Sequence, residues 1–452
     1  MIEKNDPNRK AKCEEVIEKV IEEDIKFIYL QFTDIHGLIK SFEINSKRID
    51  DFLEDGENFD GSSITGYGAI EESDKVALPD PSTFRIIPWR QNGKKVARFI
   101  CDIFNPDGTR YEGDPRYILQ KAVHKAEKEG LEYFCAPEME FFVLEEDLKK
   151  EAYGPSDLRG YFDFDPYDIN ETMRYTIAQY CDAMGIEIEA LHHEVAFGQH
   201  EVDFRYDKAV ESADNTITIK TIVKTVAAQN DMTGTFMPKP FAGINGSGMH
   251  VHQSLWKEGE NIFYDETDET YISKSLKKFI TGQLNHAREM CAVLSSWPNS
   301  YKRLVPGYEA PVYIAWGFRN RSPLIRIPNF GGNPSAARCE IRSPDPSGNP
   351  YLQFAVLLST GLKGLLSDDI ELYKPTDRNV YKFSSKEIEK AEIAALPGNF
   401  REALNEFKNS ELMKEIFGEL AFKNFYYAKL EEYDAYRLNV SEWERERYIT
   451  RL

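Results

Sequence analysis

Hydrophobic residues near the N-terminus first follow a helical period and then alternate with polar residues. The helical positions are Cys13, Val16, Ile17, Val20 and Ile21, and they predict a helix over residues 11–23. KFIYLQF and LIKSFEI then predict two strands joined by the turn TDIHG, and FRIIPW and KVARFICDIF predict a second hairpin around an Asn-Gly turn. These elements predict a small β-rich domain over residues 1–110. The Pro-, Gly- and Asp-rich segment 105–115 is its expected boundary.

The rest of the chain mixes both periods, which predicts a larger α+β domain over residues 111–452. Pro115 suits a first helical turn and Gly130 suits the end of that helix. Further strands are expected at GIEIEALHHEV, TGTFMPKPF, SGMHVHQSLW, PLIRIP and ARCEIR. Helical periods fit residues 168–184, 208–230, 272–295, 350–368 and most of 400–449.

One predicted strand, APEMEFF, carries two acids inside an apolar run. Residues i and i+2 of a strand share a face, so Glu138 and Glu140 stand side by side, with Cα atoms roughly 6.5–7 Å apart. Burying two unpaired carboxylates together is costly. We therefore expect this strand to hold a cation or a proton, although the pair alone also fits a half-exposed edge strand.

Composition narrows the class of protein. The 452 residues include 56 basic and 76 acidic side chains, a formal net charge of −20, which disfavours general binding to nucleic acid or an anionic membrane. No run of 18 apolar residues and no signal-peptide h-region is present, so neither a membrane span nor secretion is expected. The six cysteines are scattered without a C-x-x-C motif, which is typical of reduced thiols in a cytoplasmic protein.

Four further segments concentrate residues that bind ions. Five of the eight histidines lie in HHEVAFGQHE and NGSGMHVHQS, the first of which also carries Glu194 and Glu201. ARCEIRS alternates two arginines with Glu340, and the loop from YKRLVPGYEAP to RNRSPLIRIP adds four more arginines. A zinc-protease motif is disfavoured because Phe197 replaces the second histidine, and no P-loop spacing is present.

Together these residues suggest one chemistry. Glutamates with an occasional imidazole suit Mg²⁺ or Mn²⁺ better than Zn²⁺. Arginine clusters bind carboxylate and phosphate oxygens through two parallel hydrogen bonds. The combination favours phosphoryl transfer to or from a carboxylate substrate, although each segment alone could be an ordinary hairpin, ion-paired strand or solvated loop.

Seven segments resemble the signature segments of type I glutamine synthetase, in the order of that family. They are FDGSSITGY, PEMEFF, HHEVAFGQHE, NGSGMHVHQS, YKRLVPGYEAP, RNRSPLIRIP and ARCEIRSPDP, and the resemblance runs from about residue 27 to the C-terminus. It implies an N-terminal β-grasp domain and a C-terminal catalytic domain with antiparallel β-strands flanked by helices. It also implies a dodecamer of two hexameric rings, with active sites between neighbours, that makes L-glutamine from L-glutamate, ATP and ammonium.

The resemblance implies two divalent cations or more per site, Mg²⁺ or Mn²⁺. One cation would be held by Glu140, Glu194 and Glu201, and a second by Glu138, His250 and Glu340. Glutamate-binding positions would be Asn245, Gly246, Arg303, Glu309, Arg321 and Arg342. ATP would lie among Glu189, Tyr206, His252, Ser254, Arg326 and Arg338. The ammonium pocket would comprise Asp60, Ser63, Tyr161, Glu194 and Glu309.

Three of these positions carry implied catalytic roles. Asp60 would take a proton from ammonium, Arg321 would offset charge on the transferred phosphoryl group, and Glu309 would lie on a flap that keeps water out. Tyr381 is a candidate for adenylylation, but its flanks differ from those of the modified subtype. The chain therefore resembles the subtype controlled by feedback and by small regulatory proteins such as PII-type proteins.

Two other functions remain as hypotheses. A γ-glutamyl–amine ligase on the same fold predicts loss of the acidic ammonium pocket, whereas Asp60, Tyr161 and Glu309 are all present. A catalytically inactive homologue predicts broken metal ligands, whereas all six are intact.

Overall fold

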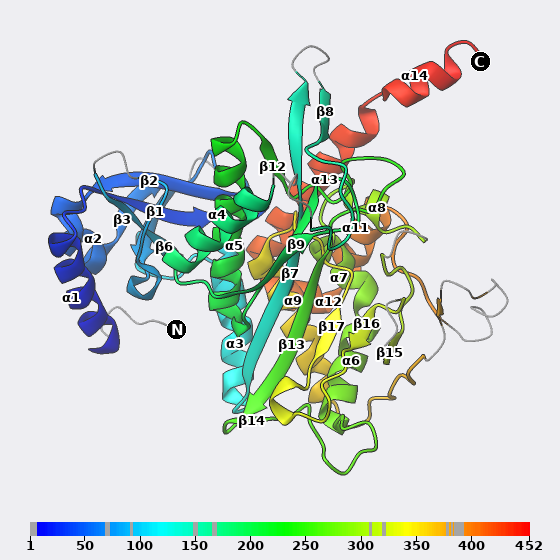
Figure 1. Cartoon of the computed structure of the whole chain (residues 1–452). Coiled ribbons are helices and arrows are strands. Elements are labelled where there is room, and N and C mark those ends of the chain that lie inside the picture. The colour runs from blue at the N-terminus through cyan, green and yellow to red at the C-terminus, as the bar shows by residue number, and fades with distance from the viewer. Residues whose placement is uncertain are drawn as a thin grey trace.

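A computed structural model shows two domains, the N-terminal one in blue at the left of Figure 1 and the catalytic one at the right. The structure describes residues 7–67, 73–90, 94–147, 152–164, 170–306, 310–318, 322–376, 379–380, 383 and 393–452. The chain is therefore an α+β protein, as its periodicity predicts.

The N-terminal domain is a six-stranded sheet covered by helices. Its strands are β1 (Phe27–Thr33), β2 (Ile39–Asn45), β3 (Glu57–Asp60), β4 (Asp74–Pro79), β5 (Arg85–Ile86) and β6 (Val96–Phe104). The order is β2-β1-β6-β4-β3, with β1 parallel to β6 and β5 paired antiparallel to β6. The predicted helix is α1 (Pro7–Glu22), and α2 (Ile49–Asp55) follows β2. The first predicted hairpin is confirmed by β1 and β2, and the strands of the second pair as β5 and β6, whereas its Asn-Gly turn lies outside the described residues.

The catalytic domain is built on an eleven-stranded sheet, of which seven strands form the main path, β15-β16-β17-β13-β7-β10-β9. These strands are β7 (Glu132–Asp147), β9 (Ile188–His193), β10 (Gln199–Phe204), β13 (Met249–Lys257), β15 (Trp316–Phe318), β16 (Ile325–Ile327) and β17 (Cys339–Ile341). The shorter strands are β8 (Ala152–Pro155), β11 (Asp207–Lys208), β12 (Thr233–Thr235) and β14 (Glu260–Asn261). Along this path only β15 and β16 pair in parallel, so the sheet is mainly antiparallel.

Helices cover one face of this sheet. They are α3 (Pro115–Lys128), α4 (Glu171–Ala183), α5 (Ala209–Gln229), α6 (Lys274–Asn285), α7 (Ala287–Leu294), α8 (Ser300–Arg303) and α9 (Pro350–Leu365). At the C-terminal end come α11 (Phe400–Asn409), α12 (Glu411–Phe417), α13 (Glu419–Leu438) and α14 (Glu442–Tyr448), the last of which projects from the body in Figure 1. Apolar residues of α3, α5 and α9 pack with those of β7 and β13 in one core.

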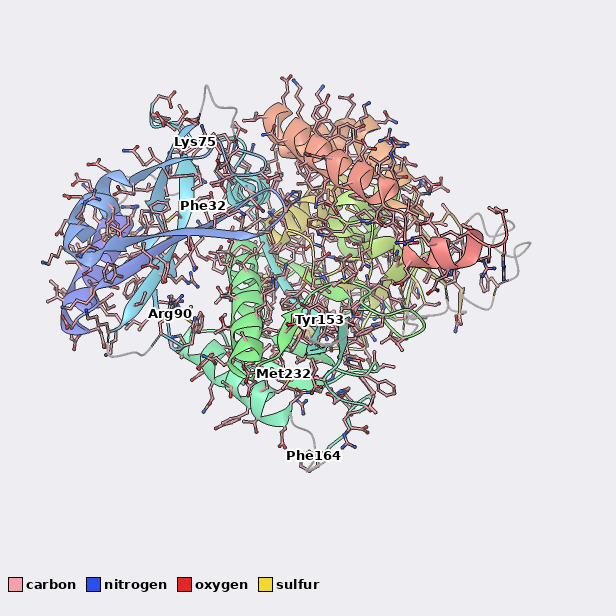
Figure 2. All side chains as sticks on the ribbon, turned by 90° about the horizontal axis from the view of Figure 1, so that it is seen from above. Phe32, Lys75, Arg90, Tyr153, Phe164 and Met232 are labelled. Carbon is pink, nitrogen blue, oxygen red and sulfur yellow. The ribbon has the colours of Figure 1, made fainter. Side chains whose placement is uncertain are left out.

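The two domains each bury an apolar core. Phe32 lies among the strands of the N-terminal domain in Figure 2 and is 4% exposed, whereas Phe164, at the edge of the molecule, is 91% exposed. A buried ionic network joins the domains, because Arg116 of α3 contacts Asp80 at 2.8 Å, Asp102 at 2.6 Å and Asp214 of α5 at 2.9 Å. This network fixes the N-terminal sheet against the catalytic domain.

Several predicted elements differ from the observed ones. The strand expected at TGTFMPKPF shrinks to β12, because the prolines at 238 and 240 have no N–H to donate to a ladder. The helix expected over 272–295 divides at His286 into α6 and α7. The helical region 400–449 divides into four helices, and Gly418 separates two of them with a φ of 76° that favours glycine.

Within the described residues, no helix combines the length and apolar character that crossing a membrane requires. All six cysteines are free thiols, and five of them are buried.

Candidate active site

Strand register brings the acids and imidazoles together on one face. On the central strand β7, Glu138 lies opposite His250 of β13, and Glu140 lies opposite Glu201 of β10. On the far side of β13, Glu340 of β17 lies opposite His252. Side chains at paired positions of neighbouring strands point to the same face of a sheet. The two acids of the PEMEFF segment therefore stand between a histidine strand and a second acidic strand.

Glu138 and Glu340 form the first half of the site. The Glu138 carboxylate lies 2.9 Å from Nδ1 of His250 and 2.6 Å from Nε2 of His252. Burial raises the pKa of Glu138, but its hydrogen bonds with the two histidines outweigh burial and hold the pKa well below the usual range. Glu340 is fully buried and forms ion pairs with Arg342, at 2.6 Å, and with Arg326. In this half the arginines beside Glu340 and the hydrogen bonds from the imidazoles to Glu138 favour the ionised form of both acids.

Glu140 and Glu201 form the second half, where negative charge is less compensated. Glu140 accepts hydrogen bonds from Nε2 of Gln199 at 2.8 Å and from the Gly248 N–H at 3.0 Å. Burial, then the charges of Glu201 and Glu194, raise the pKa of Glu140 well above its usual value. Burial and neighbouring acids also raise the pKa of Glu201 to about 10. Such acids can all ionise only if a cation joins them.

The residues present fit divalent cations. The ligand atoms of Glu138, His250 and Glu340 lie within 4.8 Å of one another, and so do those of His192, Glu194 and Glu201. Carboxylate oxygens with a single imidazole in each set suit Mg²⁺ or Mn²⁺. The first set is the trio that the sequence indicates. In the second set His192 joins Glu194 and Glu201. Glu140, which the sequence indicates as their partner, lines the cavity that also contains these three residues.

Two cavities meet at this face. One, of about 290 Å³, contains the acids together with Arg303, Arg326 and Arg342. The other, of about 360 Å³, is partly aromatic, with Phe134, Phe204 and Tyr206, and carries Arg338 at its wall. Glu138 and Asp203 line both cavities, so one ligand in each would meet at these carboxylates.

Most sequence-predicted residues come together here. The first cavity is lined by Glu138, Glu140, Tyr161, Glu194, Glu201, Asn245, Gly246, His250, Arg303, Arg326 and Arg342. The second is lined by Glu138, Glu189, Tyr206, His252, Ser254 and Arg338. Glu340 lies between His250 and Arg342, and Arg326 stands in the first cavity although it was expected near ATP.

Asp60 and Ser63 line neither cavity of their own chain. Both are exposed on the N-terminal domain, where Asp60 accepts a hydrogen bond from the Ser62 N–H at 2.8 Å. Glu309, Arg321 and Tyr381 lie outside the described residues.

Sequence reasoning missed two polar residues of the site, Asp203 and Gln199, and it placed His192 among the candidate ion-binding residues of HHEVAFGQHE without including it in a metal-ligand set. Asp203 lies opposite Glu138, and burial, then the Glu138 charge, raise its pKa to about 7. Gln199 fixes Glu140, and His192 lies 3.2 Å from Glu201. The two-residue spacing from Glu201 to Asp203 was the available signal, because it places both on one face of β10.

Acids that fit divalent cations, arginines that fit a carboxylate, and a second, more apolar cavity beside them are features of an enzyme that transfers a phosphoryl group to or from a carboxylate substrate. Comparison with known proteins specifies the class further. Residues 24–106 match the family model described as "Glutamine synthetase, beta-Grasp domain", and residues 112–448 match "Glutamine synthetase, catalytic domain".

Curated relatives agree over nearly the whole chain. The glutamine synthetase of Methanosarcina mazei is 47% identical over 440 residues, which cover 97% of this chain and 98% of the relative. The glutamine synthetase of Thermotoga maritima is 47% identical over 437 residues, which cover 96% of this chain and 99% of the relative. The chain therefore belongs to the glutamine synthetase family and is a glutamate–ammonia ligase.

Solved structures share the whole fold. "GmaS/ADP complex-Conformation 1" has a TM-score of 0.87 at 29% identity, covering 96% of this chain and 99% of that one. "CryoEM Plasmodium falciparum glutamine synthetase" has a TM-score of 0.84 at 28% identity, covering 96% and 98%. The β-grasp and catalytic domains that the resemblance implies are thus confirmed.

Proposed function

We propose that L-glutamate binds in the 290 Å³ cavity, that ATP binds in the 360 Å³ cavity, and that the two react across Glu138. The observation that carries this assignment is the shared Glu138 wall, because a phosphoryl donor and a carboxylate acceptor must meet at one point. The arginines of the first cavity suit the glutamate carboxylates, and the aromatic wall of the second suits a nucleotide. The structurally similar GmaS forms a complex with ADP, which supports nucleotide binding by this fold.

The reaction proceeds in two transfers. A γ-carboxylate oxygen of glutamate attacks the γ-phosphorus of ATP, the bond to the β-phosphate oxygen breaks, and ADP leaves. Ammonia then attacks the acyl carbon of γ-glutamyl phosphate, and phosphate leaves with the oxygen that made the attack. Two cations, Mg²⁺ or Mn²⁺, would supply charge stabilisation for both leaving groups. Glu138, His250 and Glu340 would hold one cation, and Glu140, Glu194 and Glu201, with His192 beside them, would hold the other.

The remaining side chains bind and orient the substrates. Asn245, Gly246, Arg303, Arg321 and Arg342 bind glutamate, with Glu309 closing over it. Glu189, Tyr206, His252, Ser254 and Arg338 surround ATP, and Arg326, which lines the first cavity, would act on ATP only from the glutamate side. Arg321 offsets the charge of the transferred phosphoryl group.

The ammonium pocket combines two subunits in this proposal. Tyr161 and Glu194 line the cavity of one chain, whereas Asp60 and Ser63 stand exposed on the N-terminal domain and reach the cavity of a neighbour. A head-to-tail contact of this kind closes a ring, which supports a dodecamer of two hexameric rings. Asp60 accepts the ammonium proton, which frees ammonia to attack.

Co-assembly of two inactive variants tests the shared pocket. Asp60→Ala and Glu201→Ala subunits should each assemble and be nearly inactive. Random co-assembly at equal ratio pairs an intact Asp60 with an intact Glu201 at about a quarter of the sites. Activity should return on co-expression and not on mixing the preassembled variants. Doubly tagged particles as inactive as their parents would show that both residues serve one chain.

Ammonia is the nitrogen donor of a glutamate–ammonia ligase, and the side activity to be measured against it is that of a γ-glutamyl–amine ligase. The curated relatives named glutamine synthetase are 43–47% identical over nearly the whole chain, which supports ammonia, whereas the solved structures, at 28–29% identity, do not distinguish the two donors. Competition between ammonium and methylamine, with both products quantified by mass spectrometry, decides the donor. Glutamine should dominate at equal concentrations. A dominant methylamide product would favour the alternative.

We also propose domain boundaries, location and control. The domains span residues 1–110 and 111–452, and the free cysteines suit the cytoplasm. Control is allosteric, by feedback and by PII-type proteins, and Tyr381 carries no AMP. Intact-mass spectrometry of protein from nitrogen-replete native cells should show the unmodified mass, and an added AMP on Tyr381 would contradict this.

A further inference from the structure

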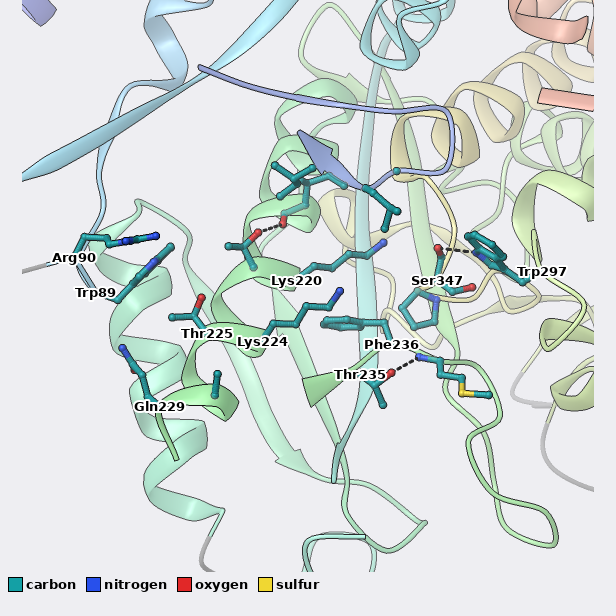
Figure 3. A pocket seen from close by; sticks show the side chains of 18 residues that line it. Trp89, Arg90, Lys220, Lys224, Thr225, Gln229, Thr235, Phe236, Trp297 and Ser347 are labelled. Atoms are coloured by element: carbon teal, nitrogen blue, oxygen red, sulfur yellow. Dashed lines mark hydrogen bonds between the residues drawn. The ribbon is translucent and has the colours of Figure 1, made fainter. Parts of the chain in front are cut away.

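A large cleft lies between the two domains, away from the active site. Its volume is about 940 Å³, and none of its lining residues borders either active-site cavity. The N-terminal domain contributes the turn at residues 37–39 together with Trp89 and Arg90. The catalytic domain contributes α5, β12 and the segment around Ser347, as Figure 3 shows. A ligand that spans this cleft would therefore contact both domains.

The cleft is cationic although the chain carries a net charge of −20. Its lining includes Arg90, Lys220 and Lys224, and no aspartate or glutamate is among the described residues that line it. Lys220 and Lys224 are one helical turn apart on α5, so both side chains project from one face. Figure 3 shows them extending side by side into the cleft. Two lysines held together, in a lining without an aspartate or glutamate among its described residues, attract anions.

Neither lysine forms a direct ion pair within the described part of the chain, and the charge of Asp345 compensates Lys220 only in part. Lys220 Nζ donates to the Gly348 carbonyl at 2.9 Å, and no ion pair to a described carboxylate is formed by either Lys220 or Lys224. Burial, then the charge of Lys224, lower the pKa of Lys220 to about 7. An anion bound between the two lysines would remove this repulsion.

The remaining walls suit a ligand with an organic body. Trp89, Phe236 and Trp297 supply apolar surface around the cations, and Thr221 and Thr225 supply hydroxyls beside the lysines. Trp297 is held in place because its Nε1 donates to the Ser347 carbonyl at 3.2 Å. Trp297 also packs against Lys429 and His36, and Trp89 packs against Tyr180, so these rings form a fixed wall against which the body of an organic anion can lie.

We propose that this interdomain cleft is a binding site for a small multivalent organic anion, carried by carboxylates or by a phosphate ester, with Lys220 and Lys224 on one side and Arg90 on the other. Carboxylate and phosphate oxygens are the groups that ammonium and guanidinium recognise. Because Arg90 belongs to the N-terminal domain and the lysines to the catalytic domain, the anion also ties the two domains together.

Calorimetric titration of the assembled full-length protein tests this site. Citrate and glycerol 3-phosphate serve as probes, in EDTA so that metal ions cannot recruit either probe to the active site. We expect binding at millimolar concentration or below from at least one probe. The probe that binds identifies the anionic group as carboxylate or phosphate ester.

Charge reversal locates the binding. Lys224→Glu should lower the affinity by at least about tenfold, the effect of losing one charge-assisted contact. Lys414→Glu, which reverses an exposed lysine on α12, is the matched control and should bind as the wild type does. Lys220 is left intact because it also bonds to Gly348. Lys224→Gln, which adds no negative charge, covers the case in which the reversal prevents folding.

Two results would overturn the proposal. One is the absence of binding by both probes, as when a neighbouring subunit fills the cleft. The other is binding that Lys224→Glu and Lys224→Gln leave unchanged, because the anion would then lie elsewhere.

Discussion

Gly248→Ala should weaken glutamate binding selectively, because a side chain at this position collides with Arg303. The added Cβ would lie 2.5 Å from Arg303 Nη2 and 3.2 Å from Oε1 of Glu140. Ordinary van der Waals contact begins at 3.4 Å. The guanidinium would therefore have to move by about 1 Å.

Arg303 has little freedom to move. Its guanidinium donates to the carbonyls of Ser343 at 3.0 Å, Pro344 at 3.2 Å and Arg342 at 3.1 Å. A shift of about 1 Å takes such contacts beyond hydrogen-bond range. A displaced Arg303 would lose its charge-assisted bond to the glutamate carboxylate, at a cost of roughly 1.5 kcal/mol. This cost corresponds to about a tenfold change in the binding constant for glutamate.

Steady-state kinetics with each substrate varied in turn measures the effect. The KM for glutamate should rise about tenfold, while the KM for ATP stays near the wild-type value because the nucleotide cavity lies across Glu138. Gly154→Ala is the matched control, since its added Cβ meets nothing within 4 Å. A folded Gly248→Ala enzyme with an unchanged KM for glutamate would refute the role of Arg303.

Three further predictions concern metals, the flap and pH. Excess chelator should abolish turnover, and Glu340→Ala should leave an assembled protein with little activity, because the ligand set of Glu138, His250 and Glu340 is then broken; full turnover in chelator would contradict the metal assignment. Glu309→Ala should release ADP faster than glutamine, since water then reaches the acyl phosphate; one glutamine per ADP at full rate would rule out the flap. Burial, then the charges of Lys429 and Lys40, lower the pKa of His36 to about 3. Below pH 6.5, His36 is therefore protonated in the unfolded chain but stays neutral in the folded chain. The free energy of unfolding therefore falls as pH drops below 6.5, by about 1.4 kcal/mol at about pH 5.5. Between about pH 7.5 and 5.5 the thermal midpoint of His36→Gln should fall less than that of the wild type. An equal fall in both proteins would exclude His36 as the cause.

Periodicity predicted the elements best where one pattern ran unbroken. The strand that holds Glu138 and Glu140 and the helix that begins at Pro115 both form where the sequence predicts them. The break at His286 was missed because no proline or glycine signals it, whereas the break at Gly418 carried a glycine that a helical period alone does not interpret. Packing between elements therefore decided boundaries that local sequence did not.

The site shows the same division. Spacing within a strand predicted that Glu138 and Glu140 share a face, and the structure places both in one cavity. Which strands would become neighbours depends on long-range pairing, so the position of Asp203 opposite Glu138 could not be read from the sequence. The intersubunit role of Asp60 goes beyond a single chain and rests on the proposal above.

Oxygen transfer from glutamate to phosphate tests the central claim most directly. Glutamate labelled with ¹⁸O in both γ-carboxylate oxygens is converted with ATP, Mg²⁺ and ammonium, and the phosphate and glutamine formed are analysed by mass spectrometry. If γ-glutamyl phosphate is the intermediate, each phosphate carries one ¹⁸O, each glutamine keeps one, and Glu340→Ala produces neither. Phosphate free of ¹⁸O while glutamine accumulates would contradict the account.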